Sequence, residues 1–492
     1  MKHTKKRILS AIIAALMLMT AACSFSDSIT TETTAVQTET EVNVTETEPD
    51  ILESIGSYNF DNADFTVICQ HTAERPNAAP EEETGDVFYD SVYRRDRSIE
   101  ERYSVKIVYV QDTNRSNIKN LVTKGVQAQE DHYHIVLTCL SDGFNALAPG
   151  GMLTDLRAIE ELNLNEAWWN QSMNHAMTFD NKQFVASGPI SLSYYHSAFL
   201  TLVNLNMAKN YNINADDLYT AVLEGRWTLD MLETLSKDMY ADLNNDGKAD
   251  GDDQYGFALC DSSGNALFTG SGETMAKNSG HTIEMTMSGD RSITVLDRIH
   301  SLCATADVLK TEKLGNDSSG VSNKIALFKK GSILFEVSGI NVVITYLRDM
   351  EDDYGVLPIP KWDDAQEEYY TLYNPWMPSG FGIPVSCSDT EFAGIISEAL
   401  ARLSYSTVQP ALFEITLKEK ATRDEKSKEM LNILFDTITV DLNAVFDFGG
   451  SSTLLREYAV AQSDKFVSSY EKYSKKIQKD IDKLIEQYNK LA

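Results

Sequence analysis

Alternating strand and helix patterns between residues 65 and 139 constrain the fold of this chain more than any other feature. Short apolar runs at 65–69, 105–110 and 134–139 are separated by segments whose apolar residues have helical spacing, at 87–103 and 118–128. Strands that alternate with helices in this way are typical of a parallel sheet flanked by helices. We therefore predict an α/β protein whose N-terminal part is built on parallel strands.

The loops that follow two of these strands are candidate walls of a binding cleft. Ligands of parallel sheets bind at the carboxyl ends of the strands. The first strand ends in the polar loop 70–77, and the third ends in the loop 141–145. Gln70 and Asp142 are the polar side chains that we expect to face a ligand there.

Residues 242–253 have the spacing of a twelve-residue calcium loop. Gly247 stands at position 6, and the carbonyl of Lys248 supplies position 7. Side-chain oxygens fall at positions 1, 3, 5, 9 and 12, from Asp242, Asn244, Asp246, Asp250 and Asp253. At position 12 the EF-hand pattern has Glu, and Asp is one methylene shorter. We predict a structural Ca²⁺ between a helix that opens at Thr228 and a strand at 255–259; the alternative is a solvated acidic turn.

The N-terminus has the pattern of a secretion signal. A basic segment at 2–7 precedes an apolar run at 8–19, too short to span a membrane, and small residues lie directly before Cys23. This arrangement resembles the bacterial lipobox, although Thr20 stands where that pattern usually has Leu. The resemblance implies that residues 1–22 are a lipoprotein signal peptide and that acylated Cys23 anchors the chain to the outer face of the cell membrane. An ordinary cleaved secretory signal is the alternative.

The segment that follows is predicted to be a tether. Residues 23–56 are rich in Thr and Glu, lack Lys and Arg, and show no apolar periodicity. Such a segment cannot bury a core and is expected to be disordered. The chain after it is too long for one ordinary domain and suits two lobes.

Composition argues against several classes of function. The chain has 43 Lys and Arg against 73 Asp and Glu, a formal net charge of −30, so nucleic acid is not an expected partner. Besides Cys23 there are five cysteines without C-x-x-C spacing, which indicates neither a disulfide framework nor a zinc site. They are expected to be small core residues.

No enzyme motif is present in the sequence. H-E-x-x-H, G-x-S-x-G and phosphate-loop patterns are all missing, so we predict that the chain is not an enzyme. Two other classes stay open. A secreted glycosidase needs only two facing carboxylates, and a calcium-dependent surface adhesin would bind polymers or cells.

Several short motifs, taken in their order along the chain, resemble family 1 extracellular solute-binding lipoproteins. The motifs are VYRRDRSIEERYSV (92–105), GRWTLD (225–230), DLNNDGKADGDDQYGF (242–257), FKKGSILF (328–335), DDYGVLPIPK (352–361) and LKEKATRDEKSKEM (417–430). Members of this family are receptors of bacterial ABC importers, many of them for sugars. The resemblance implies a periplasmic-binding-protein-like clamshell of two lobes, each a mainly parallel sheet flanked by helices, that closes on its ligand.

By similarity to maltose-binding protein, the resemblance also implies lobe boundaries. The first lobe would comprise residues 57–165 and 340–382, and the second would comprise 166–339 and 383–492. Residues 328–339 would form the strand that crosses back toward the first lobe. Residues 354–360 would form a first-lobe strand, and 381–385 would return the chain to the second lobe.

The function implied is capture of a small solute, above all a carbohydrate or oligosaccharide, by a monomeric receptor that delivers it to the transmembrane subunits of an ABC transporter. Oligopeptides and polyols stay open as ligands. Asn341 stands where maltose binders carry a Trp that stacks on sugar, which argues against maltodextrin. A sugar site needs aromatic platforms and fixed polar groups. We expect the platforms from Trp376, Trp169 and Tyr195, and the polar groups from Gln70, Asp142 and Asn341.

The C-terminal residues predict an amphipathic helix. Apolar side chains at 477, 481, 484, 485 and 488 recur at helical spacing, with Lys and Asp between them. We expect this helix to dock on the second lobe; binding to a membrane surface is the alternative.

Overall fold

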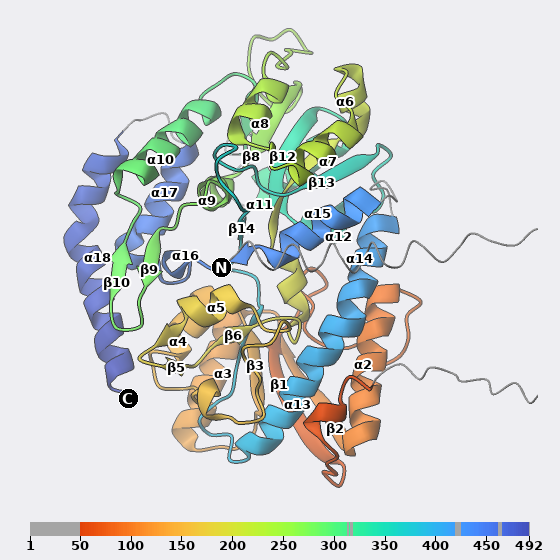
Figure 1. Ribbon diagram of the computed structural model, residues 1–492, viewed down its shortest axis with the longest axis vertical. Coiled ribbons are helices and arrows are strands. Elements are labelled where there is room, and N and C mark those ends of the chain that lie inside the picture. Colours follow the sequence, from red (N-terminus) through yellow and green to blue (C-terminus); the bar gives the residue numbers. More distant parts are fainter. Residues whose placement is uncertain (1–49, 312–313, 315–317, 419–424, 461–464, 492) are drawn as a thin grey trace, which may run out of the picture. The chain divides into compact units, whose positions relative to one another are not determined.

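The computed structural model describes residues 50–311, 314, 318–418, 425–460 and 465–491 (Figure 1). The predicted signal peptide, the lipidated Cys23 and the tether up to residue 49 lie outside these ranges. The fold described below is that of the compact unit Asp50–Ala492. In its described parts, no helix is both long enough and apolar enough to cross a membrane.

The first sheet has five strands in the order β2-β1-β3-β15-β6. The adjacent strands β2 (Val105–Asp112), β1 (Ala63–Gln70) and β3 (Ile135–Thr138) are parallel, as the sequence predicts. β15 (Gly380–Gly382) runs antiparallel to both β3 and β6 (Ala186–Ser187). The strand–helix alternation at 65–139 therefore forms the parallel part of one mixed sheet.

Helices cover the first sheet. They are α2 (Val87–Tyr103), α3 (Arg115–Ala128), α13 (Thr390–Leu403) and α14 (Gln409–Lys418). Asp86 caps α2 by accepting hydrogen bonds from the backbone N–H groups of Phe88 and Tyr89, which fixes where this helix begins. On α13, Phe392 and Ile396 are buried in one apolar cluster with Phe65 of β1. This packing attaches α13 to the first sheet although more than 250 residues separate the two segments.

The second sheet also has five strands, in the order β11-β8-β12-β7-β13. β11 (Val308–Lys310), β8 (Tyr255–Leu259) and β12 (Ile333–Gly339) are parallel. β7 (Phe199–Asn204) runs antiparallel to both β12 and β13 (Tyr354–Leu357). The sheet is therefore mixed, with its parallel strands on one side.

Helices surround the second sheet (Figure 1). They are α6 (Leu205–Asn210), α7 (Ala215–Leu223), α8 (Leu229–Ser236), α9 (Asp261–Gly270), α10 (Asp290–Cys303), α11 (Ser318–Lys329), α12 (Asn341–Tyr346), α15 (Glu425–Asp436), α16 (Leu442–Phe446) and α17 (Ser451–Val460). Thr228 caps α8 by accepting from Met231 N at 3.3 Å, so the predicted N-cap is confirmed. The helix ends at Ser236.

Segments that connect the two sheets lie side by side. β14 (Thr371–Leu372) pairs with β16 (Ile438–Thr439), and Ala198 forms a bridge with Tyr373. We call these segments, 198, 371–373 and 438–439, the hinge ribbon. Because several strands connect the sheets at one place, the expected relative motion of the two lobes is a bending there.

Several predicted lobe boundaries are wrong. β6 pairs within the first sheet, so residues 166–187 stay with the first lobe. β13 belongs to the second sheet although it was predicted for the first lobe, whereas β12 in the second sheet and β15 in the first agree with the predicted boundaries. The second lobe therefore comprises 199–357 and 425–491, and the first comprises 50–187 and 380–418. An apolar strand pattern shows that a strand is buried but not which sheet it joins.

The predicted tether ends too late. Residues 53–55 form a short 3₁₀ helix, and Leu52 is buried against the core of the first lobe. An ion pair of 2.6 Å joins Asp50 to Arg102 at the end of α2. The segment 50–56 is thus part of the folded body, because Leu52 packs into the core. The Thr- and Glu-rich composition of residues 23–56 as a whole does not reveal this single apolar contact.

The C-terminal helix α18 (Phe466–Asn489) forms as predicted and buries Ile477, Ile481, Leu484 and Tyr488. Its docking surface is wider than predicted. Phe466 packs against Tyr458 of α17 in the second lobe, with ring centres 5.3 Å apart. At the other end, the Tyr488 ring stacks on Phe179, with centres 4.1 Å apart, in the hairpin of β4 (Thr178–Phe179) and β5 (Lys182–Gln183). The helix therefore contacts both lobes.

Candidate ligand-binding cleft

Parallel strands of both sheets end at one cavity, which we call the cleft cavity. Its volume is about 140 Å³. β3 ends at Thr138 and leads into the turn 140–144, and from this side Ser141 and Asn145 line the cavity. β8 ends at Leu259 and leads into α9, which contributes Ser262 and Asn265. Because ligands of α/β sheets bind at the carboxyl ends of strands, this position favours the cleft cavity over larger hollows elsewhere.

The loop 374–378 places Trp376 in the wall of the cleft cavity. The first lobe holds this loop at three points: Ser141 N donates to Pro375 O at 3.0 Å, Asn77 Nδ2 donates to Pro378 O at 2.5 Å, and the Cys139 thiol lies 2.9 Å from Trp376 O. Trp376 itself is 42 % exposed although its loop is fixed. A fixed loop with an exposed aromatic ring is a suitable stacking platform.

Arg115 lies over the Trp376 ring, with the guanidinium carbon 4.7 Å from the ring centre. Asp142 holds this arginine through a contact of 3.3 Å between Oδ2 and Arg115 Nε. The same carboxylate accepts from Ser116 Oγ at 2.7 Å and from Lys119 Nζ at 2.6 Å. Partial burial raises the pKa of Asp142, but these hydrogen bonds outweigh it and lower the pKa below its usual value. Asp142 therefore positions Arg115, and both of its carboxylate oxygens already accept hydrogen bonds within the protein.

The second lobe contributes an unpartnered acceptor to the cleft cavity. Asn265 is 6 % exposed, and its Nδ2 donates to Ser452 Oγ at 3.2 Å. Its Oδ1 is buried and has no hydrogen-bond partner among the described residues. A buried acceptor without a partner costs free energy, and a ligand hydroxyl placed in the cavity would supply the missing donor.

The other predicted ligand residues are placed differently. Gln70 is buried, and its Oε1 lies 3.2 Å from the Cys139 thiol, so it supports the Trp376 loop from behind. Tyr195 is also buried and donates to Ser404 O at 3.1 Å. Asn341 begins α12 and lines neither the cleft cavity nor the larger cavity described next. Of the predicted platforms, the structure brings only Trp376 to the cleft cavity.

Asn265 was missed by the sequence analysis, although a signal for it exists. The rule about carboxyl ends holds for the predicted strand at 255–259 as it does for the N-terminal strands. Applied to this strand as well, the rule indicates the first turns of α9, where Ser262 and Asn265 lie.

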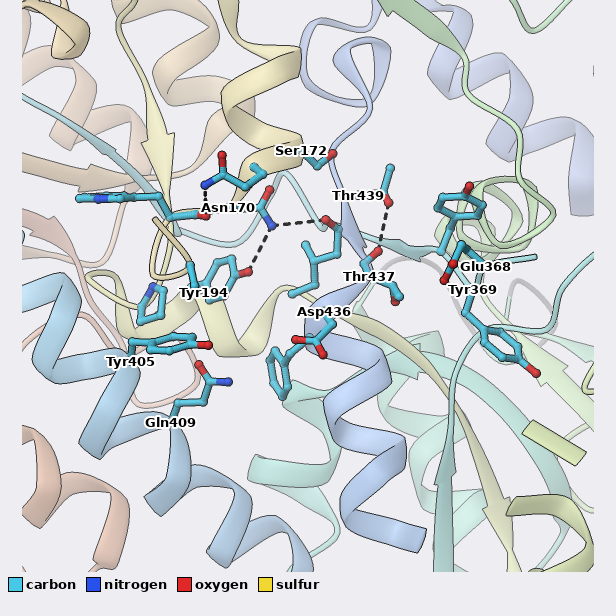
Figure 2. A pocket seen from close by; sticks show the side chains of 17 residues that line it. Asn170, Ser172, Tyr194, Glu368, Tyr369, Tyr405, Gln409, Asp436, Thr437 and Thr439 are labelled. Atoms are coloured by element: carbon cyan, nitrogen blue, oxygen red, sulfur yellow. Dashed lines mark hydrogen bonds between the residues drawn. The ribbon is translucent and has the colours of Figure 1, made fainter. Parts of the chain in front are cut away.

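A larger cavity of about 400 Å³ adjoins the hinge ribbon (Figure 2), and we call it the hinge cavity. Trp169 lines it, with its indole N–H directed to Glu398 Oε2 at 3.2 Å. Asn170 connects two of its walls, because Nδ2 donates to Tyr194 OH at 3.2 Å and to Ile438 O at 3.3 Å. The hinge cavity shares no lining residue with the cleft cavity, and no parallel strand of either sheet ends at it.

The predicted calcium loop is an ordered turn between α8 and β8. Asp242 accepts from Gly247 N at 2.9 Å, and Asn244 accepts from Asp246 N at 2.9 Å. Asp253 is fully buried and accepts from Leu243 N and Asp250 N, at 3.1 and 3.2 Å. In the described parts of the chain, no group of three or more His, Cys, Asp or Glu side chains is arranged to hold a metal ion. The donor types suit Ca²⁺, and its binding here stays a prediction.

The protein has two mixed β-sheets flanked by helices and joined by several strands. Parallel strands of both sheets have their carboxyl ends at one cavity between them. This arrangement defines the periplasmic-binding-protein class of fold. No protein-family model matches the chain, and no curated protein matches its sequence. Solved structures match it at low identity. An extracellular solute-binding protein from Staphylococcus aureus in complex with maltose has a TM-score of 0.56 and 13% identity, over 85% of this chain and 98% of that chain.

Further solved structures agree. An ABC substrate-binding protein from Listeria monocytogenes in complex with cycloalternan has a TM-score of 0.52 and 12% identity, over 87% of this chain and 100% of that chain. A maltose/maltodextrin-binding domain from Bdellovibrio bacteriovorus bound to maltotriose has a TM-score of 0.51 and 13% identity, over 87% and 100% of the two chains. The chain therefore has the fold of maltose-binding-protein-like ABC substrate-binding proteins, as its sequence motifs predict.

Proposed function

We propose that this chain is a solute receptor that captures a carbohydrate and delivers it to the transmembrane subunits of an ABC importer. One observation carries the proposal: Trp376 from one lobe, with an exposed ring, and Asn265 from the other, with an unpartnered Oδ1, line the same cavity. A sugar offers apolar C–H faces and a ring of hydroxyls. The indole ring suits the first, and the amide oxygen suits the second.

The proteins of like fold support an oligosaccharide as the ligand class. The Staphylococcus aureus protein is described with maltose and the Listeria protein with cycloalternan. In this chain the cleft cavity is small in the structure, so a longer ligand requires the lobes to open at the hinge ribbon. A ligand that contacts both lobes selects the closed arrangement, as expected for a receptor that signals occupancy by its shape.

A glycosidase is the less favoured function. Glycoside hydrolysis needs two carboxyl groups on either side of the scissile bond. Of the described residues that line the cleft cavity, Asp447 is the only acid, and its Oδ1 already accepts from Ser452 N at 2.8 Å and Thr453 N at 3.1 Å. A binding role therefore fits the cavity better than hydrolysis does.

The remaining features of the proposal concern where the receptor works. Cys23 would carry the lipid anchor, and residues 24–49 would tether a monomeric body to the outer face of the membrane. Asp242, Asn244, Asp246, Asp250 and Asp253, with the Lys248 carbonyl, would hold a structural Ca²⁺. Calcium is abundant outside cells, so a site of modest affinity would be filled there.

A thermal-shift screen of the full secreted chain tests the proposed ligand class. Panels of oligosaccharides, oligopeptides and polyols are compared, since a ligand that binds the native state raises the melting temperature. We expect shifts from oligosaccharides and no new reducing ends after prolonged incubation. If only peptides raise the melting temperature, the ligand is a peptide and not a carbohydrate. Release of new reducing ends would favour the glycosidase.

A further inference from the structure

The hinge cavity carries negative charge without a compensating cation. Two carboxylates line it, Glu368 and Asp436, and no Lys, Arg or His is among its described lining residues. Both side chains are exposed, and neither carboxylate has a hydrogen-bond or ion-pair partner within the described parts of the chain. Partial burial, followed by the nearby charge of Glu429, raises the pKa of Asp436 above its usual value. A positive group beside Asp436 would relieve both effects.

Aromatic rings make up much of the remaining wall. They are Trp169, Tyr194, Tyr369, Tyr370, Tyr405 and Phe435. Tyr405 is 40 % exposed, and Figure 2 shows the hydroxyl groups of Tyr194 and Tyr405 directed toward the space above Asp436 and Gln409. Faces of aromatic rings attract cations, most strongly where water is partly excluded. The cavity thus combines the two features that recognise an organic cation.

Other polar groups of the hinge cavity are already satisfied within the protein. Thr371 Oγ1 lies 3.0 Å from Thr437 Oγ1, and Ser172 Oγ accepts from Val440 N at 2.9 Å. Among the described lining residues, the unengaged polar groups therefore include the two carboxylates and the side chains of Tyr370, Tyr405 and Gln409. A neutral sugar would leave both exposed carboxylates to solvent, whereas a cation would pair with one of them.

We propose that the hinge cavity is a second binding site, selective for a small organic cation such as an amine or a quaternary ammonium compound, with Asp436 as its counter-ion and the surrounding rings as its walls. A volume of about 400 Å³ admits a ligand of that size. The site is separate from the cleft cavity and does not depend on which solute binds there.

Calorimetry of the full secreted chain with matched pairs of probes tests the proposal. Putrescine is compared with butane-1,4-diol, and choline with 3,3-dimethylbutan-1-ol, because each pair differs chiefly in charge. We expect one or both cations to bind with a stoichiometry near one while their neutral counterparts do not. Binding should weaken as salt is raised, because the attraction is partly screened.

Variants assign the binding to this cavity. Asp436→Asn should weaken binding of the cation at least tenfold, and Tyr405→Ala should weaken it as well. Glu429→Gln removes a nearby charge that does not line the cavity, so it should retain most of the affinity. The proposal is overturned if neither cation binds at concentrations up to about 10 mM, if the neutral probes bind as tightly as the cations, or if Asp436→Asn and Tyr405→Ala bind like wild type.

Discussion

The guanidinium of Arg115 lies over the ring of Trp376, 4.7 Å from its centre, and Asp142 holds Arg115 in that position. One face of the indole is thereby covered by the protein, while 42 % of the residue stays exposed at the cleft cavity. The arrangement fixes the ring before a ligand arrives, so less conformational entropy is lost on binding.

Removing the Asp142 carboxylate, which holds Arg115 over Trp376, should weaken oligosaccharide binding although the Trp376 ring is still present. In Asp142→Ala, Arg115 and Lys119 lose their shared carboxylate, and Trp376 becomes more mobile. We expect oligosaccharide affinity to fall severalfold, less than when the ring itself is removed, and calorimetry measures the difference. Asp131→Ala, which changes an acid in the same lobe that bonds Ser388, serves as the control. Equal affinities for Asp142→Ala and wild type would show that the support is irrelevant.

Asn265→Leu should separate binding from stability. The unpartnered Oδ1 of Asn265 costs the folded protein about 1–3 kcal/mol, so replacing the amide should leave the free energy of unfolding unchanged or higher. Oligosaccharide affinity should nevertheless fall about tenfold or more. Denaturant unfolding and calorimetry on one preparation give both quantities.

Asn278→Leu is the matched control for that variant. Asn278 is also buried, but its amide is satisfied: Nδ2 donates to Ala176 O and Thr178 O, both at 2.9 Å, and Oδ1 accepts from Gly280 N at 2.8 Å. Here the substitution should lower stability by roughly 2 kcal/mol or more and leave affinity unchanged. If Asn265→Leu behaves like this control, Asn265 is a structural residue.

The calcium loop predicts a chelator effect. Ion bound only to the folded state at a hundred times its dissociation constant adds about 2.7 kcal/mol of stability. Chelation should therefore lower the melting temperature of wild type, and Asp246→Ala should abolish the effect. Asp252→Ala changes an acid of the same loop at a position that supplies no ligand, so its response to chelator should persist. A wild-type melting temperature that chelator does not alter, with no metal found by elemental analysis, would refute the site.

His196 predicts a loss of stability in acid. It is 2 % exposed, and burial, only partly offset by the backbone of Glu74, lowers its pKa from 6.5 to about 4. Between these values the unfolded chain binds a proton that the folded protein does not, so stability falls as pH drops from 6.5 toward 4. The contribution is about 3 kcal/mol.

His196→Leu should remove that contribution. Urea unfolding of wild type and variant at pH 7 and pH 4 gives the change in unfolding free energy for each. We expect the wild type to lose about 3 kcal/mol more than the variant over this interval. Identical losses would mean that the imidazole is protonated in the folded protein as readily as in the unfolded one.

Local patterns predicted the elements of this fold better than their pairing. The strands near 65, 105 and 135 and the N-cap at Thr228 follow from apolar spacing and capping chemistry, which act within a few residues. The assignment of β13 to the second sheet does not follow from local sequence, because a short buried strand has the same composition in either sheet. Its antiparallel pairing with β7 is decided by packing between distant segments.

The same limit applies to the candidate cleft. Trp376 was predictable as an aromatic in a loop rich in Pro and Gly, where no helix face could absorb it. The ion pairs of Asp142 with Arg115 and Lys119 could not be predicted, because these partners belong to α3 and come close to Asp142 only in the folded protein. Burial of Tyr195 likewise depends on contacts with the distant turn at Ser404.

Calorimetry of Trp376→Ala beside Trp362→Ala, with the oligosaccharide that gives the largest thermal shift, tests the central claim most directly. Trp362 is a matched control, because it also lies under an arginine, Arg291 at 5.8 Å, but lines neither cavity. The account predicts that Trp376→Ala loses affinity about tenfold or more, while Trp362→Ala binds like wild type. Equal and unchanged affinity in both variants would contradict a carbohydrate site in the cleft cavity.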